Sequence, residues 1–599
     1  MVPTAKLSAL LLALALLAIP TLAQEPEPPQ PNTDPAPNNT PQLGRAVATV
    51  HGIVRNAASG EPLPRTLVLI GGESGQGALT DGDGRFEISG VPTGPEPFEL
   101  RRPGFDDAGA GGAGMNGWKN SRGFTHNVFV TAETPELTFA MRPNNSIRGH
   151  IELSTGDPAQ NISIILLERA VDNGRALWRP HANTRTNADG NYHFGGLSDG
   201  LYAISTEPAM DSDMFGMPPV AGNTRPIALN GYPAVFYPAA REFSGAAKIQ
   251  LSGGGETQAN MTLTLEPFHL VRATVNVPPS MQGSGDGRAV MATLIDADGH
   301  QGTYGAQYDS AANSVQTLLP DGTYTLRVSA MRTNGRIENG NLPFSGANTG
   351  QIDFTVAGKP ITNLRVSVAP VTTSPVQVIV MQSSNPPQAQ PPNAGASVGA
   401  NGGGGLFLAV SPANPGRSDA MMTELAHGPI PGNLDTNPMD PGTYWVHTTV
   451  NQRGLCAQSF TAGGASLARE PLAVGLGGTT APLTLTLGDD CASLQLSFPG
   501  SLLSIPGNLA SMTPGEEPAF TTYVVPDFDS TVDINSITLS PGGTITLNNL
   551  TPGPYHVYTF TTPVELEYHN PEALATLPSQ TVTLEPGSTN NLIVEAPKP

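Results

Sequence analysis

A short motif that recurs five times along the 599-residue chain constrains its fold more than any other feature. Each copy holds an alternating run of residues, a turn with glycine and a second alternating run, as in TDGDGRFEISGVPTGPEPFEL from Thr80. The turn glycines recur every 106 to 122 residues, at Gly94, Gly200, Gly322, Gly442 and Gly553. Because alternation turns one face of a strand inward, this period predicts one small β-sandwich for each copy.

Two further features repeat with the motif. A tyrosine follows the glycine by two residues in four copies, and the first copy has Phe98 instead; the tyrosines are Tyr202, Tyr324, Tyr444 and Tyr555. At the boundaries, the last expected strand of one domain runs almost directly into the first strand of the next, as in LTFAMRPNNSIRGHIEL from Leu137. Junctions this short leave little slack, so we expect a semi-rigid line of domains.

The N-terminus has the pattern of a secretory signal peptide. A basic start with Lys6 precedes an apolar run, and small residues lead to Ala23. The run is too short to span a bilayer, which favours cleavage before Gln24 over a membrane anchor. Residues 24–45 are rich in proline and asparagine and predict an extended linker. We therefore expect an exported chain without a membrane span, located in the periplasm, at the cell surface or in the medium.

Composition excludes several classes of partner and fold. The net charge of -21 argues against nucleic acid and against a polybasic attachment to lipid, since both need clustered lysine and arginine. The 68 glycines and 59 prolines, with only 13% charged residues, suit strands joined by tight turns. Few stretches are rich in helix-forming residues, and the one expected helix is a short one near residues 571–576.

The first repeat resembles the carboxypeptidase regulatory-like domain over about 60 residues. The matching positions are Gly52, Val54, Gly60, Pro62, Val68, Leu69, Thr80, Asp81, Gly84, Phe86, Gly94, Pro103 and Gly104. The second repeat matches less fully, and the other three keep mainly the glycine–tyrosine turn. This resemblance implies a seven-stranded, transthyretin-like sandwich of the carbohydrate-binding-like group, an accessory module without catalytic residues. It is typical of long secreted bacterial proteins that string such modules together.

The fold class expected is therefore all-β, a tandem array of about five small Ig-like or transthyretin-like sandwiches. The expected divisions are a signal peptide at 1–23, a linker at 24–45, and domains at 46–142, 143–266, 267–370, 371–487 and 488–599. The fourth domain carries a low-complexity loop rich in proline, glutamine and glycine, from about residue 383 to 405.

Three patterns resemble catalytic or metal sites, and each has a plainer interpretation. His569 and Glu572 have the spacing of a zinc site, but no histidine follows to complete the ligand set. Gly395–Gly399 has the spacing of a nucleophile elbow without the strand and helix that this chemistry requires. Asp81 and Asp83 have the spacing of the first two ligands of a calcium loop, but Arg85 stands where the loop needs another oxygen ligand. We expect no catalytic residue, metal or cofactor.

The two cysteines, Cys456 and Cys491, are candidates for a disulfide in an exported chain. Between them lies what looks like the last strand of the fourth domain, which returns the chain toward Cys456. The sequence therefore predicts a bridge that pins the junction of the fourth and fifth domains, against the alternative of two buried thiols.

Aromatic residues in irregular stretches are the remaining candidates for binding. Trp118, Tyr232, Phe236 and Tyr237 have rings that suit the apolar face of a sugar, although most such rings in sandwiches belong to the core. The sequence favours a non-catalytic scaffold or interaction protein of the cell envelope. A carbohydrate-binding array and an accessory subunit of a secreted peptidase or outer-membrane transporter remain as alternatives. The partner is then a polysaccharide or an envelope protein.

Overall fold

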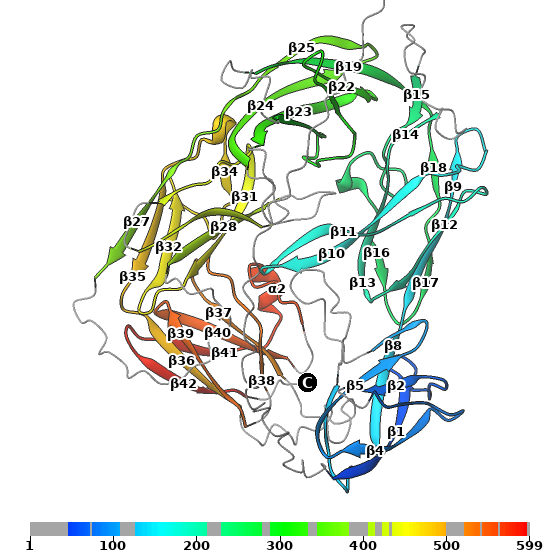
Figure 1. Ribbon diagram of the computed structural model, residues 1–599, viewed down its shortest axis with the longest axis vertical. Coiled ribbons are helices and arrows are strands. Elements are labelled where there is room, and N and C mark those ends of the chain that lie inside the picture. Colours follow the sequence, from blue (N-terminus) through cyan, green and yellow to red (C-terminus); the bar gives the residue numbers. More distant parts are fainter. Residues whose placement is uncertain are drawn as a thin grey trace, which may run out of the picture. The chain divides into compact units, whose positions relative to one another are not determined.

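The fold is built almost entirely from strands, as Figure 1 shows. The computed structural model describes residues 46–71, 75–107, 126–211, 229–277, 288–333, 344–382, 405–413, 422–430, 434–498, 520–539, 542–560 and 564–595. The expected signal peptide and linker lie outside these residues. Strand β4 (Arg85–Pro92) shows why the sequence folds in this way, because Phe86 and Ile88 are buried while Glu87 between them is exposed.

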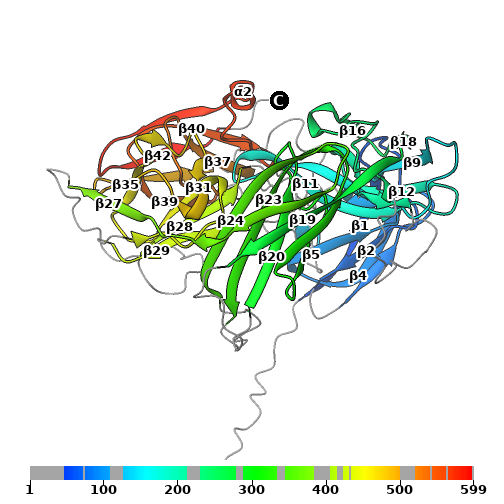
Figure 2. The same cartoon turned by 90° about the horizontal axis from the view of Figure 1, so that it is seen from above.

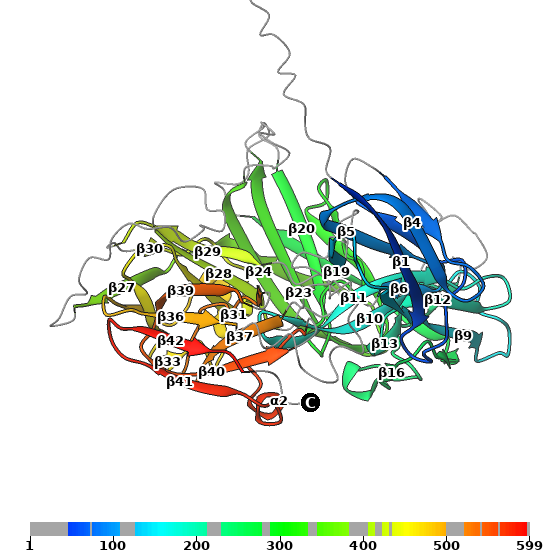
Figure 3. The ribbon, with the colours of Figure 1, turned by 90° about the horizontal axis from the view of Figure 1, so that it is seen from below.

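The first sandwich packs two four-stranded sheets around one apolar core. Its other strands are β1 (Val47–Asn56), β2 (Leu67–Ile70), β3 (Gly77–Leu79), β5 (Gly94–Arg101), β6 (Phe105–Asp107), β7 (His126–Val130) and β8 (Leu137–Pro143). The sheet orders are β4-β1-β8-β6 and β3-β2-β5-β7. Figure 3 shows β1 beside β4, which pair in antiparallel fashion.

The second sandwich contains a long hairpin, formed by two of its strands, β10 and β11. Its strands are β9 (Asn145–Leu153), β10 (Ser163–Asp172), β11 (Arg175–Arg185), β12 (Asn191–Leu197), β13 (Gly200–Thr206), β16 (Ile249–Leu251), β17 (Glu256–Gln258) and β18 (Met261–Leu263). The sheet orders are β11-β10-β13-β16 and β12-β9-β17, with β18 also paired to β9. A short 3-10 helix, η1 (Phe243–Gly245), precedes β16.

The third sandwich borrows two strands from the chain that precedes it. Its strands are β14 (Ala209–Met210), β15 (Leu229–Tyr232), β19 (Glu266–Asn276), β20 (Arg288–Ile295), β21 (Gln307–Asp309), β22 (Ser314–Leu319), β23 (Gly322–Thr333), β24 (Phe344–Val356), β25 (Ile361–Ser367) and β26 (Ala369–Pro370). Strand β15 pairs with β19, so the segment that leaves β13 extends the next sheet before it returns to β16. Figure 2 shows β20, β23 and β24 of the other sheet side by side.

The fourth and fifth sandwiches follow the same plan. The fourth contains β27 (Pro375–Met381), β28 (Leu406–Pro412), β29 (Thr423–Gly428), β30 (Leu434–Asp435), β31 (Gly442–Val450), β32 (Cys456–Ala462), β33 (Ala465–Ser466), β34 (Leu472–Val474), η3 (Leu476–Gly478) and β35 (Leu483–Gly488). The fifth contains β36 (Ala492–Ser497), β37 (Phe520–Pro526), β38 (Ile537–Leu539), β39 (Thr544–Leu550), β40 (Gly553–Phe560), α2 (Pro571–Ala575), β41 (Gln580–Leu584) and β42 (Thr589–Ile593). Each has its own core.

One topological rule is common to all five sandwiches. A strand at the start of each one pairs in parallel with a strand at its end, namely β1 with β8, β9 with β17 and β18, β19 with β25, β27 with β35, and β36 with β42. All the other strand pairs between the described residues that form these sheets are antiparallel. Parallel neighbours point the same way, so the chain enters and leaves each sandwich at opposite ends. This rule explains why successive domains are joined so directly.

The repeated glycine–tyrosine turn is a tyrosine corner. In all four copies the tyrosine hydroxyl donates a hydrogen bond to the carbonyl oxygen four residues upstream, at 2.7–3.1 Å: Tyr202 to Ser198, Tyr324 to Pro320, Tyr444 to Asp440, and Tyr555 to Thr551. At two of these turns the ring folds back over the glycine and leaves little room for a side chain there. A Cβ on Gly322 would lie 2.9 Å from the Tyr324 hydroxyl oxygen, and one on Gly442 would lie 3.3 Å from the Tyr444 ring.

The expected all-β array of five sandwiches is confirmed. Residues 47–599 form one unit, apart from the first 46 residues. Among the residues that the structure describes, no helix has the length and apolar character needed to cross a bilayer.

Candidate functional site

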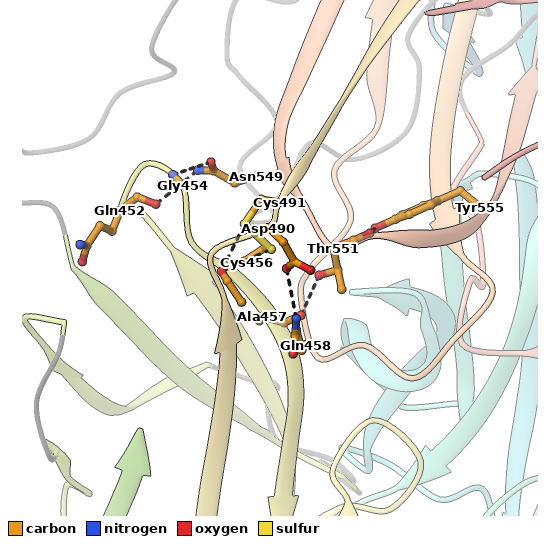
Figure 4. Close-up of a disulfide and its surroundings, with 11 residues drawn as sticks. Gln452, Gly454, Cys456, Ala457, Gln458, Asp490, Cys491, Asn549, Thr551 and Tyr555 are labelled. Carbon is orange, nitrogen blue, oxygen red and sulfur yellow. Dashed lines mark hydrogen bonds between the residues drawn. A yellow bond between two sulfur atoms is a disulfide. The ribbon is translucent and has the colours of Figure 1, made fainter. Parts of the chain in front are cut away.

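The disulfide predicted from the sequence is present between Cys456 and Cys491 (Figure 4). Their Cα atoms are 5.7 Å apart, and the bridge joins the first residue of β32 in the fourth sandwich to the residue before β36 in the fifth. Polar contacts surround it, since Thr551 donates to the Ala457 carbonyl oxygen at 2.8 Å and Gln458 donates to Asp490 at 3.3 Å. The bridge therefore pins this junction, as expected.

The predicted ligand-contact aromatics do not gather at a surface. Tyr232 and Phe236 are each 3% exposed and lie in apolar cores, and Tyr237 packs half-buried against the core of the second sandwich. The rings of Tyr232 and Phe236 are enclosed and have no face open to a sugar, so we do not carry their role as ligand contacts further. Trp118 lies outside the described residues.

The His569–Glu572 pair belongs to a helix start. The Asn570 side chain accepts hydrogen bonds from the backbone N–H groups of Glu572 and Ala573 and so caps α2, with Pro571 in the first turn. Among the described residues, no group of three or more metal-ligating side chains is found. The segment with Gly395–Gly399 lies outside the described residues.

Sequence reasoning missed a polar region that links different sandwiches, and it begins at the tip of the β10–β11 hairpin. We call this tip, residues Asp172, Asn173, Gly174 and Arg175, the clasp. Asn173 and Gly174 both have positive φ, at 45° and 72°, which is the type I′ geometry of a tight hairpin. The Asn-Gly pair between alternating runs was the sequence signal that could have found it. Its partners, hundreds of residues away, carry no such signal.

The clasp contacts the fourth and fifth sandwiches. The guanidinium of Arg175 lies 3.5 Å from the centre of the Trp445 ring and donates to the Ala468 carbonyl oxygen at 2.9 Å. The His569 backbone N–H donates to the Gly174 carbonyl oxygen at 3.0 Å. A Cβ on Gly174 would lie 2.5 Å from the Tyr568 ring, so only glycine fits there.

Further contacts lie along the same hairpin. Arg169 on β10 forms an ion pair with Glu567 at 2.5 Å, and the Val171 backbone N–H donates to Glu565 at 3.5 Å. The second sandwich is therefore in contact with the fourth and the fifth. A simple line of domains, as expected from the short junctions, does not account for these contacts between sandwiches that are not neighbours in sequence.

A Ser–His–Asp chain of hydrogen bonds lies next to the clasp. The Ser411 Oγ on β28 is 2.8 Å from Nε2 of His447 on β31, and Nδ1 of His447 is 2.7 Å from Oδ1 of Asp533 in the fifth sandwich. Adjacent antiparallel strands bring the first two together, since Ala409 pairs with His447 and Ser411 lies two residues further along. Thr448 also bonds Thr531 through both backbone and side chain.

This order of groups is that of a nucleophile, a base and an orienting carboxylate. However, Ser411 and His447 are each only 6% exposed. A substrate carbonyl needs open space beside the nucleophile, and a hydroxyl enclosed in this way does not provide it. In this arrangement the chain of hydrogen bonds holds His447 between the fourth and fifth sandwiches.

Several titratable groups at this junction have shifted pKa values. Burial, together with smaller effects of nearby Arg175 and His447, lowers the pKa of His569 to about 3. Burial also lowers the pKa of Arg175 to about 10 and raises the pKa of Tyr568. The pKa of Asp172 is raised, mainly by burial and against the opposing effect of His447. Removal from water disfavours the charged form of each group, so the junction is sensitive to their protonation.

A separate cleft of about 570 Å³ lies in the first sandwich. It is lined by Arg65, Leu67, Leu79, Leu100, Arg101, Arg102, Pro103, Phe105, Asp106 and Asp107. The Arg102 guanidinium lies 5.0 Å from the centre of the Phe105 ring. Asp107 in the lining forms a 2.7 Å pair with His126, and both side chains are almost fully buried.

The first sandwich also carries the family likeness. Residues 49–141 match the family model of the carboxypeptidase regulatory-like domain. The resemblance expected from the sequence is thus confirmed over this sandwich. No curated protein matches the chain significantly.

Several solved structures are similar over part of the chain. The Bacillus anthracis TIE protein is 11% identical, with 68% of this chain and 64% of that chain covered and a TM-score of 0.15. This chain thus matches less than two thirds of that protein. A streptococcal ancillary pilin is 11% identical over 54% of this chain and 99% of its own, with a TM-score of 0.18. A putative adhesin from Bacteroides ovatus is 7% identical over 38% and 93%, with a TM-score of 0.14. These TM-scores are too low for the likenesses to carry an argument about function.

Proposed function

We propose that this chain is a non-catalytic, secreted, multidomain scaffold or interaction protein of the cell envelope. The observation that carries the proposal is the bracing between sandwiches. A disulfide joins the fourth sandwich to the fifth. Strand β15, from the segment between two strands of the second sandwich, pairs with β19 of the third sandwich. The clasp joins the second sandwich to both the fourth and the fifth. Bracing of this kind fixes the positions of several surfaces at once, which is what a scaffold requires.

The polar cluster with the strongest likeness to a catalytic site supports the same proposal. Ser411 and His447 are buried at a domain junction, and Asp533 comes from the neighbouring sandwich. Their hydrogen bonds satisfy buried polar groups that would otherwise be costly to enclose. The accessory character of the carboxypeptidase regulatory-like family at residues 49–141 agrees with this role.

Fractionation combined with cross-linking in intact cells tests the proposal. We expect the chain outside the cytoplasm, with its N-terminus at or near Gln24, cross-linked to an envelope protein or a polysaccharide. Recovery of a peptidase or a transporter subunit would identify it as an accessory subunit. A cytoplasmic chain with Met1 intact contradicts the proposal, as does hydrolase activity that disappears in Ser411→Ala.

Carbohydrate binding is a second candidate function, favoured by the cleft in the first sandwich. Guanidinium and carboxylate groups beside the Phe105 ring combine hydrogen bonding with an apolar plane, as sugar recognition requires. A glycan array with the full chain tests it, and Phe105→Ala should abolish any binding. The matched control is Phe129→Ala, because Phe129 lies in the same sandwich and is 54% exposed outside the cleft lining. Equal loss in both variants, or no bound glycan, argues against this function.

A further inference from the structure

Strand β27 of the fourth sandwich has one paired side and one open side. It pairs with β35 from Val376 to Met381 (Figure 1), whereas on its other side β30 pairs only with Pro375 and Val376. Within the described parts of the chain, no strand pairs with the rest of that side, from Gln377 to Met381. An open edge of this kind offers backbone hydrogen-bonding groups to another chain.

The direction of the backbone groups on β27 follows from its contact with β30. The Thr436 N–H donates to the Ser374 carbonyl oxygen at 2.8 Å, so the Ser374 carbonyl points toward the β30 side. Backbone groups point to alternate sides along an extended strand, so those of Val378 and Val380 point to this side too. Their side chains pack partly buried against the core of the fourth sandwich. The core therefore holds β27 in place while its edge stays open.

The side chains on the outer face of β27 are apolar and exposed. Ile379 is 39% exposed and Met381 is 56% exposed. The sequence has no charged residue between Arg365 and Arg417, although the net charge of the chain is -21. Sheets are usually protected from edge-to-edge pairing by a charged residue or a proline on the edge, and the open part of β27 has neither.

Another edge strand of the same sandwich, β29, is protected. The Asn437 backbone N–H donates to the Leu425 carbonyl oxygen at 2.6 Å, and its side chain donates to the Glu424 carbonyl oxygen at 3.2 Å. Glu424 also forms a pair with His427 at 2.6 Å, which places charge on this strand. One domain thus protects one edge and leaves another open, which is the pattern expected where the open edge has a partner.

We propose that two copies of this chain form a dimer by antiparallel pairing of β27 with β27. A two-fold axis at Ile379 sets Val378 opposite Val380 of the second copy, where the two valines exchange both backbone hydrogen bonds. The same axis sets Ile379 against Ile379 of the second copy on the outer face. This pairing goes beyond the proposed scaffold role, because it joins two chains into one assembly.

The fold and the charge of the chain favour a second copy as the partner. In this register, Val376 lies opposite Gln382 of the second copy, just beyond the end of its β27. Each β30 therefore begins where the partner strand ends, and the edge accepts one strand in a closed pair and not a growing fibre. An uncharged edge also lets two chains of net charge -21 meet without repulsion at the contact itself. About five residues pair in each copy, so we expect a weak dimer with a dissociation constant in the micromolar range.

Sedimentation velocity of the full chain, at concentrations from about 1 to 100 μM, tests the proposal. We expect a reversible shift from monomer to dimer. Ile379→Lys alone and Ile379→Glu alone should each weaken the dimer about tenfold or more, because the two-fold axis sets like charges directly opposite. An equal mixture of the two variants should restore it, because opposite charges then meet. Only a contact of Ile379 with its own copy predicts this restoration.

Two controls separate this contact from general stickiness and from unfolding. Met291→Lys places the same charge on β20, an edge strand of the third sandwich where Met291 is 60% exposed, and it should leave the dimer unchanged. Hydrogen exchange should slow in residues 376–382 as the concentration rises, with exchange in β28 and β31 unchanged in every variant. A chain that stays monomeric throughout, or a dimer that survives Ile379→Lys, overturns the proposal. So does a mixture of folded variants that stays monomeric, or a dimer without slower exchange at β27.

Discussion

The tyrosine corners and the clasp satisfy polar groups over very different distances along the chain. In a corner, the hydroxyl and its acceptor are four residues apart, so a single short motif carries both partners. In the clasp, Arg175 and its carbonyl acceptor are 293 residues apart, and Val171 and Glu565 are 394 residues apart. The difference teaches that each sandwich is specified locally, whereas the way the sandwiches are braced is specified by pairs that no local pattern connects.

The largest effect should come from truncating a corner ring. Tyr202 is fully buried, so Tyr202→Ala leaves a cavity and removes the bond to Ser198, at a cost of about 3–5 kcal/mol. Hydrogen exchange followed by mass spectrometry should show faster exchange throughout the second sandwich and unchanged exchange in the fifth. Equal loss in both would mean that the sandwiches unfold together, which would remove the distinction between local and distant stabilisation.

Reduction of the disulfide should have the next largest effect. Closing a 35-residue loop stabilises the folded chain by about 3–4 kcal/mol on loop-entropy grounds. Chemical denaturation with and without reductant should show a loss confined to the fourth and fifth sandwiches. The variant Cys456→Ala with Cys491→Ala is the control, since it should match the reduced chain and be insensitive to reductant. A loss spread over the first three sandwiches would contradict this assignment.

The sequence supplied the parts of the fold that repeat. Alternation and the glycine–tyrosine spacing predicted five sandwiches, and the compartment argument predicted the Cys456–Cys491 bridge. It did not predict the hydrogen-bond chain of Ser411, His447 and Asp533. A serine and a histidine on different strands carry no signal of contact until the strand register is known. The interpretation of Tyr232 and Phe236 suffered from the same limitation. An irregular stretch looks like a surface loop in sequence, but here it packs into cores and adds β15 to the next sheet.

A change at the clasp should have a smaller and strictly distant effect. Arg175→Ala removes a partly buried cation–π contact and a hydrogen bond, together about 2 kcal/mol. Exchange at the hairpin tip should become about 30-fold faster, with the corner of the second sandwich unchanged. Arg185→Ala on the same strand is the matched control, because its guanidinium bonds only Asn161 within the described part of its own sandwich. Equal acceleration in both variants would show that the tip frays without the clasp.

The smallest effect should come from removing a single corner hydroxyl. Tyr202→Phe keeps the buried ring and deletes one hydrogen bond, whose acceptor is the carbonyl of the exposed residue Ser198, so we expect a loss of about 1 kcal/mol. Tyr324→Phe should cost more, because its bond to the Pro320 carbonyl is buried and water cannot replace the lost donor. Denaturation of both variants in parallel, read by exchange in each sandwich, measures the difference. If Tyr324→Phe costs no more than Tyr202→Phe, burial does not set the strength of the corner, and the ring packing alone explains why the motif recurs.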